Sequence, residues 1–147
     1  MREIFKYGSV RGVMFPYVYK LNKLQETSMS TLQVYCLKPE PQCICSALTI
    51  PSSFWKRAKG LLGKSSMTNE EGVLFYHCSS IHMIGMKFPI DVVYLNNSLE
   101  IVKLVESIKP WQVSFCHSAV HTLELASGSI SKSKLKLGEK LQIRGIE

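Results

Sequence analysis

The sequence predicts a mainly β fold, a β-rich sandwich or open barrel with one capping helix. Short runs of apolar and β-branched residues recur along the chain, separated by turn residues. Helical spacing of apolar residues is clearest in one segment, at about residues 52–63. No internal repeat interrupts this pattern, and 147 residues suffice for one domain with a hydrophobic core.

Six segments have the pattern of β-strands. They are rich in β-branched or aromatic residues and are bounded by Pro, Gly, Asn or Ser. The segments are residues 43–51, 72–78, 91–95, 98–108, 119–127 and 141–146. Asn96-Asn97 suits a hairpin turn, because asparagine tolerates positive φ. Residues 37–42 (LKPEPQ) are expected to be an extended connection, and residues 128–140 a loop with room for one helical turn.

The capping helix is predicted for residues 52–63 (SSFWKRAKGLLG). Ser52 or Ser53 can cap its first turn, and Gly63 can end it. Its apolar residues recur at helical spacing, namely Phe54, Ala58, Leu61 and Leu62. Gly60 weakens a helix interior, which indicates close packing against another part of the chain.

The chain divides into an extension and a domain. Residues 1–30 are expected to be a flexible N-terminal extension, with Met29 as a plausible internal start, and residues 31–147 a single domain. The formal net charge of +7 lies mostly towards the two ends, as spaced lysines and arginines without a dense basic run. Such spacing is typical of a solvated surface, so we predict no nucleic-acid partner.

Cysteine use and hydropathy favour a cytoplasmic location. The five cysteines are scattered, and Cys43 and Cys45 lack the two-residue spacing of a zinc knuckle or redox pair. We expect free thiols in a reducing compartment. No apolar stretch reaches the roughly 20 residues of a membrane helix, and no convincing signal peptide is present. No cofactor is predicted. The sequence contains neither a Gly-rich phosphate loop nor a G-x-S-x-G nucleophile elbow.

Asp91 is the only aspartate in the chain and precedes the apolar run Val92–Leu95. A carboxylate beside a buried strand is costly unless it is paired or hydrogen-bonded. One hypothesis is structural: Asp91 accepts backbone N–H groups, or pairs with Arg57, and fixes the start of the strand after Pro89. The other hypothesis is functional: Asp91 lines a pocket as a ligand anchor or general base.

His82 is a second candidate, nine residues before Asp91. On one straight strand the two residues would be about 30 Å apart and, at an odd separation, on opposite faces. A direct pair therefore requires a sharp bend between them. Gly85 and Pro89 permit such a break. On its own, His82 is either a hydrogen-bonded structural histidine or a group that binds an anion or moves a proton.

A soft-metal site for copper or zinc is a further alternative. Potential donors cluster within a short segment, namely His77, Cys78, His82, Met83 and Met86. Cys78 and His82 would stand about 13 Å apart on an extended strand, so only a looped segment brings them to one ion. Methionines in an apolar stretch are usually core residues, so we predict no metal site.

Glu124 and Trp111 complete the set of candidates. Glu124 lies within an alternating strand and is either solvated or lines the same cavity as Arg57. The Arg57 guanidinium can pair through its two-pronged fork with either carboxylate, Glu124 or Asp91. Trp111 follows Pro110 and is either a packing aromatic or a ring that stacks on a ligand at the rim of a cleft.

An ordered series of motifs resembles a known family. The motifs RAKGLLGK, GVLFYHCSSIHMIGMKFPIDVVYLN, IKPW, HTLELASG and LKLGEKL lie within residues 43–143. They resemble the domain-of-unknown-function 192 family, in its version with an Ile-His-x-x-x-Met-x-x-Pro-Ile-Asp-Val core. Met83 stands where a threonine is common, so the hydroxyl of that position is absent here.

The resemblance implies a small, mostly β, jelly-roll-like domain without an established reaction. Members of this version can occur beside secretion or Flp-type pilus genes. We therefore expect a non-enzymatic module that binds a small ligand or a peptide, with envelope or pilus assembly as the process it serves. The alternatives are a small hydrolase or lyase that uses His82 with Asp91 or Glu124 as acid and base, and a soft-metal binder. The predicted binding residues are Arg57, His82, Met86, Asp91, Trp111 and Glu124.

Overall fold

Nine strands and one short helix make up the part of the chain that the structure describes. The computed structural model describes residues 31–51 and 61–146. The strands are β1 (Thr31–Cys36), β2 (Gln42–Thr49), β3 (Glu71–Phe75), β4 (Ser80–His82), β5 (Ile90–Leu95), β6 (Ile101–Ile108), β7 (Val113–Phe115), β8 (His121–Ala126) and β9 (Leu141–Ile146). The helix is α3 (Ser129–Ser133), between β8 and β9.

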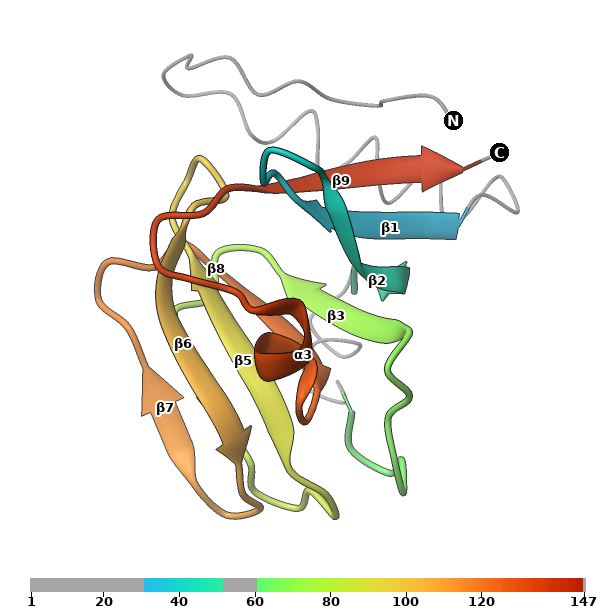
Figure 1. Ribbon diagram of the computed structural model, residues 1–147. Helices are drawn as coiled ribbons and strands as arrows, with labels where there is room; N and C mark the ends of the chain where they lie inside the picture. The colour runs from blue at the N-terminus through green and yellow to red at the C-terminus, as the bar shows by residue number, and fades with distance from the viewer. Residues whose placement is uncertain (1–30, 52–60, 147) are drawn as a thin grey trace.

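The strands form two sheets of very different size. The larger sheet has seven strands in the order β6-β5-β8-β3-β2-β1-β9, and the smaller one pairs β4 with β7. Only β2 and β3 pair in parallel within the large sheet, so it is mixed. Figure 1 shows β1, β2 and β9 at the top and β3, β5, β6 and β8 below. The prediction of a mainly β fold is confirmed, and the sheet is open, with β6 and β9 at its edges.

The six predicted strands correspond to β2, β3, β5, β6, β8 and β9. The hairpin between β5 and β6 turns after Asn96, whose side-chain oxygen accepts the N–H groups of Ser98 at 2.9 Å and Glu100 at 3.0 Å. α3 is the helical turn expected within residues 128–140. The three strands β1, β4 and β7 are additions to the predicted set.

Two predictions fall wholly or mostly on parts of the chain outside the described residues. These are the N-terminal extension, residues 1–30, and the capping helix, of which residues 52–60 are not described. The last three residues of that predicted helix, 61–63, form a turn, and Lys64 N–H donates to the Leu61 carbonyl at 3.2 Å.

Alternation along β5 divides the interior into two cores. Val93 and Leu95 point into a central core that also holds apolar residues of β1, β2, β8, β9 and α3. Ile90, Val92 and Tyr94 point into a second core beneath β4 and β7, here called the ribbon core. All six residues of β5 are buried, because both faces of this strand are covered.

The parallel pair β2–β3 depends on a close approach at Gly72. A Cβ atom built on Gly72 would lie 2.6 Å from Cys45 Sγ and 3.3 Å from a Leu125 methyl. Any side chain at this position would push β2 and β8 away from β3. Glycine is therefore required here by space rather than by its freedom in φ.

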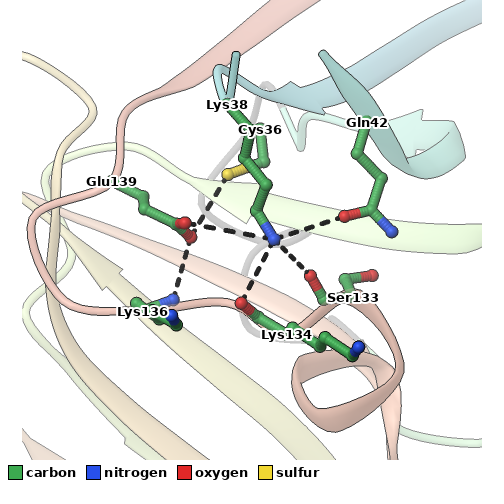
Figure 2. A network of polar contacts seen from close by, with 7 residues as sticks. All are labelled: Cys36, Lys38, Gln42, Ser133, Lys134, Lys136 and Glu139. Atoms are coloured by element: carbon green, nitrogen blue, oxygen red, sulfur yellow. Dashed lines mark hydrogen bonds and ion pairs between the residues drawn. The ribbon is translucent and has the colours of Figure 1, made fainter. Parts of the chain in front are cut away.

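α3 is held at both ends by charged side chains from distant parts of the chain, Asp91 of β5 and Lys38 of the connection between β1 and β2. At its start, the buried Asp91 carboxylate accepts the Ile130 N–H at 2.8 Å. At its end, Lys38 Nζ donates to the carbonyls of Ser133 at 2.7 Å and Lys134 at 3.2 Å (Figure 2). A five-residue helix is marginal by itself, so these contacts and the burial of Ile130 keep it in place.

Candidate binding site

Asp91 is a buried carboxylate with two backbone partners. Its side chain is 0% exposed and points towards α3. One carboxylate oxygen accepts the Ser107 N–H and the other the Ile130 N–H, both at 2.8 Å. Ser107 has a φ of 47°, so the bend of β6 that presents its N–H is held by this contact. These contacts fit the first of the two hypotheses for Asp91, that it accepts backbone N–H groups.

His82 lies far from these contacts, on the outer surface of β4. The chain bends between the two residues as the hypothesis required: β4 and β5 belong to different sheets, and Gly85 has a φ of +79°. His82 is exposed, whereas Asp91 is enclosed on the α3 side of β5. The structure therefore does not bring His82 and Asp91 together.

Glu124 is the second interior carboxylate, and it differs from Asp91 in having no partner. It pairs across the backbone with Val73 of β3 and Val92 of β5, both of which belong to the ribbon core. No hydrogen bond or ion pair joins its carboxylate to another described residue. Burial raises the pKa of Glu124 to about 7. Its predicted partner Arg57 lies outside the described residues, so the Arg57–Glu124 and Arg57–Asp91 pairs stay predictions.

Tyr94 lies on the same face of the sheet as Glu124. Its hydroxyl is buried beneath the small sheet, beside the Ser114 side chain. Burial raises the pKa of Tyr94, the Ser114 side chain opposes this rise, and negative charge on Cys78, Cys116 and Glu124 adds to it. The interior side of the small sheet thus carries several polar side chains with few partners.

The outer side of the small sheet is apolar. We call β4 and β7 with the adjoining residues Ile84 and Trp111 the ribbon. Ser114 faces inward, while its neighbours Val113 and Phe115 are 69% and 58% exposed. Trp111, two residues before Val113, is 71% exposed, and Ile84 is 50% exposed. Four large apolar side chains are therefore displayed together with His82, which pairs with Val113 across the ribbon.

Backbone hydrogen bonds hold the exposed apolar side chains of the ribbon in place. Met83 N–H donates to the Gln112 carbonyl at 2.7 Å, and Trp111 N–H donates to the Met83 carbonyl at 2.9 Å. Trp111 adopts a φ of 70°, a conformation that a bulky residue rarely takes. Met83 and Met86 are buried beneath, in the ribbon core. Of the predicted binding residues, His82 and Trp111 are exposed on the ribbon, and Met86 is buried beneath it.

Sequence reasoning missed Val113, Phe115 and Ile84. The signal was present in WQVSF, residues 111–115, where apolar residues occupy every second position. That segment is short and follows Pro110, so its alternation alone does not predict a strand. His121 was also missed. It is fully buried, its Nδ1 accepts the His77 N–H at 3.2 Å, and burial and the charge of His77 lower its pKa to about 4.

The soft-metal hypothesis receives no support from the described residues. Among them, no group of three or more His, Cys, Asp or Glu side chains could hold a metal ion. Met83 and Met86 are buried, while His77 and His82 are exposed. All five cysteines are free. Within the described ranges, no helix is long and apolar enough to span a membrane.

Comparisons with known proteins agree with this fold. Residues 37–143 match the domain-of-unknown-function 192 family, which is described as "Uncharacterized ACR", and the chain belongs to that family. No curated protein matches the chain.

Two solved structures share the fold. One is a protein of unknown function from Novosphingobium aromaticivorans, with 16% identity, coverage of 75% of this chain and 83% of that chain, and a TM-score of 0.66. The other is described as a putative transcription regulator from Sinorhizobium meliloti, with 16% identity, coverage of 78% and 92%, and a TM-score of 0.66. At this identity the similarity concerns the fold alone.

Proposed function

We propose that the protein is a non-enzymatic binding module whose ligand is an extended segment of a partner protein, docked on the outer face of the ribbon. The observation that carries the proposal is the exposure of Trp111, Val113 and Phe115 at 71%, 69% and 58%. Contiguous apolar side chains on a monomer surface generally mark a site of interaction.

The spacing of these side chains suits a peptide in an extended conformation. Val113 and Phe115 are two residues apart on one strand, a separation of about 7 Å. An extended peptide presents its alternate side chains at the same interval, so two or three of its apolar residues can contact the ribbon at once. Trp111 supplies the large rigid ring that commonly dominates such interfaces.

Charge at the rim favours a peptide that also carries acidic residues. Lys103 Nζ lies 5.8 Å from the centre of the Phe115 ring and donates to the Phe115 carbonyl at 2.8 Å. His117 contacts the same ring, with the ring centres 5.1 Å apart. The positive charge of Lys103 beside an apolar stripe favours ligands of opposite charge and speeds their association. Envelope or pilus assembly is the process that we propose such a module serves.

A selection from random peptides displayed on phage tests the proposal. We expect the protein to enrich peptides with alternating apolar residues and at least one acidic residue. One enriched peptide is then synthesised and its affinity is measured by fluorescence anisotropy. The combined variant Trp111→Ser, Val113→Thr and Phe115→Thr should bind this peptide at least about tenfold more weakly than the wild type. The matched control is Leu137→Ser, because Leu137 is 66% exposed but lies in the segment after α3. Equal affinity for the wild type and the combined variant would refute the proposal.

One observation favours the second candidate, a small hydrolase or lyase. The pKa of Glu124, raised by burial to about 7, is suited to general acid–base catalysis at neutral pH. The test uses p-nitrophenyl acetate as a chromogenic probe. Ester hydrolysis by the wild type that is lost in both Glu124→Gln and His82→Gln would support this candidate. Hydrolysis equal to that of buffer, or unchanged in both variants, would oppose it.

We also propose a cytoplasmic location. The support is that all five thiols are free, and that Cys36 and Cys45 are buried in the core. Free thiols in this number are typical of a reducing compartment. Fractionation of the native cells followed by immunoblotting tests the location, and recovery outside the cytoplasm would refute it.

A further inference from the structure

A second surface, on the other side of the large sheet, has the features of a small-molecule site. A partly open cavity of about 250 Å³ lies between β2, the turn at Asn69 and Glu70, and α3. α3 packs on the central core, whereas the ribbon covers the ribbon core. The cavity is therefore separate from the proposed peptide surface.

Two serine side chains of largely buried residues line this cavity. Ser129 and Ser133 are 5% and 7% exposed, and both residues belong to the cavity wall. They are four residues apart on α3 and so share one face of the helix. Neither hydroxyl makes a hydrogen bond with a described residue, and Figure 2 shows the Ser133 hydroxyl turned away from Lys38. Neither hydroxyl oxygen is fully enclosed, so both can be reached from the cavity by a ligand.

The cavity wall also carries one charge of each sign. Lys132 projects from α3, and Glu70 belongs to the turn before β3. Both residues are exposed, and neither forms an ion pair with another described residue. Asn69 adds an amide, and Cys43 adds an exposed thiol. A simple anion would be repelled by Glu70 and a simple cation by Lys132, while a zwitterion would find an opposite charge for each end.

We propose that this cavity binds a small zwitterion of the α-amino acid class. In that arrangement the ligand carboxylate lies near Lys132 and the hydroxyls of Ser129 and Ser133, and the ligand ammonium lies near Glu70. The volume supports this class, because about 250 Å³ is below the range of roughly 300–1,000 Å³ that holds drug-sized ligands. The site is independent of the ribbon, so it can be tested whether or not the peptide proposal holds.

Amide chemical shifts measured by NMR provide the test, on the full chain labelled with ¹⁵N. The probes are L-alanine and L-serine as zwitterions, succinate as a dianion and putrescine as a dication. We expect the two amino acids to shift the signals of the cavity wall in a saturable manner, with smaller effects from succinate and putrescine. Saturable shifts from succinate or putrescine that match those of the amino acids would overturn the zwitterion assignment. Shifts scattered over the surface, or none, would overturn the site itself.

Variants of the two charged residues add a second criterion. Lys132→Met and Glu70→Gln should each weaken amino acid binding about tenfold, and Ser129→Ala should weaken it less. The matched control is Lys136→Met, because Lys136 is exposed in the same segment but does not line the cavity. An equal loss of affinity in Lys136→Met would show a general effect of charge and overturn the proposal.

Alkylation of Cys43 provides a readout that does not depend on spectral assignment. Cys43 is exposed at the cavity wall, whereas Cys78 lies outside it, beside the ribbon core. Saturating L-alanine should slow the reaction of Cys43 with iodoacetamide and leave the rate at Cys78 unchanged, as measured by mass spectrometry of peptides. Equal protection of both thiols, or protection of neither, would count against occupation of the cavity.

Discussion

At the scale of single residues, the two interior carboxylates have opposite energetic roles. Each oxygen of Asp91 accepts one backbone N–H, so its charge is balanced within the fold. The carboxyl of Glu124 has no such partner among the described residues, and burial raises its pKa to about 7. The same chemical change, from carboxylate to amide, should therefore destabilise the protein at Asp91 and stabilise it at Glu124.

We expect Asp91→Asn to lower the free energy of unfolding by about 2–3 kcal/mol. Asparagine has only one acceptor oxygen, so its amide group would face either the Ser107 or the Ile130 N–H and leave that donor unsatisfied. Urea unfolding at neutral pH measures the change. The control Glu106→Gln removes an exposed carboxylate and should change the free energy by less than about 0.5 kcal/mol. A loss in Asp91→Asn no larger than in this control would contradict a structural role.

The effect of Glu124→Gln should depend on pH. Between the ordinary pKa of 4.5 and the raised value of about 7, folded Glu124 keeps a proton that unfolded Glu124 releases. Folding therefore becomes less favourable as pH rises through this window, and the full penalty is present above pH 7. Glutamine removes that penalty, so the variant should be more stable by about 1–3 kcal/mol at pH 8, allowing for the partial exposure of the side chain.

Urea unfolding curves at a series of pH values measure this gain. Below pH 4.5 both states of Glu124 are protonated, so the wild type and Glu124→Gln should have similar stability there. At pH 8 the two substitutions should change the free energy of unfolding in opposite directions: Asp91→Asn lowers it and Glu124→Gln raises it. A Glu124→Gln variant that is less stable than the wild type at pH 8 would show that the carboxylate has a favourable partner.

At the scale of elements, α3 depends on charges supplied from distant parts of the chain. Lys38 Nζ donates to two carbonyls at the end of α3 and lies 3.9 Å from Glu139 Oε1. A cation at a helix C-terminus contributes up to about 2 kcal/mol when it is partly buried. Glu139 in turn accepts the Lys136 N–H at 2.9 Å, so one lysine organises the whole segment from α3 to β9 (Figure 2).

Lys38→Met should loosen α3 without disturbing the sheet. We expect faster amide hydrogen exchange at Lys132, Lys134 and Leu135, whose N–H groups close the turns of this segment. Global stability should fall by about 1 kcal/mol. Lys136→Met is the control, because the backbone of Lys136 makes the contact with Glu139 while its side chain is exposed. Unchanged exchange in α3 would refute this role of Lys38.

The elements also differ in how well the sequence predicts them. β5 and β8 were predictable because long apolar or alternating runs need few assumptions about the rest of the fold. β4 and β7 have three residues each, and their pairing depends on the bend at Gly85 and the turn at Trp111. Such short strands carry too little periodicity to identify alone.

The features of the candidate site also differ in how well the sequence predicts them. The bend between His82 and Asp91 was expected from Gly85 and Pro89, but the direction of each side chain after the bend was not. The donor at Ile130 is 39 residues from Asp91 in the sequence, so tertiary packing alone selects it. The stripe of exposed residues on the ribbon was equally hidden, because an exposed and a buried apolar residue look alike in a sequence.

At the scale of the whole molecule, the large sheet separates two surfaces of different chemistry. The ribbon displays apolar side chains on one side, and α3 with its polar cavity lies on the other. Asp91 and Glu124 belong to adjacent, paired strands but point to opposite sides, Asp91 towards α3 and Glu124 towards the ribbon core. The two surfaces therefore rest on different cores, and substitutions on one surface should leave binding at the other unchanged.

The stability of the whole molecule should also reflect a compensation between two buried groups. The pKa of His121 is lowered from 6.5 to about 4, first by burial and second by the charge of His77. Between those values the unfolded chain binds a proton that folded His121 does not, so stability falls as pH decreases through this window. Glu124 has the opposite slope between pH 4.5 and about 7. The two contributions oppose each other from pH 4.5 to 6.5.

Removing Glu124 should reveal the pH dependence that His121 contributes to the free energy of unfolding. In Glu124→Gln, stability should fall more steeply than in the wild type between pH 6.5 and 4.5, by up to about 1.4 kcal/mol per pH unit. Adding His121→Asn should return the slope to that of the wild type, whatever the cost of the substitution itself. Other groups, such as Glu71 with its lowered pKa, contribute equally to all three proteins and cancel in the comparison. Equal slopes in the single and the double variant would mean that His121 titrates normally in the folded protein, and that its burial does not keep it neutral.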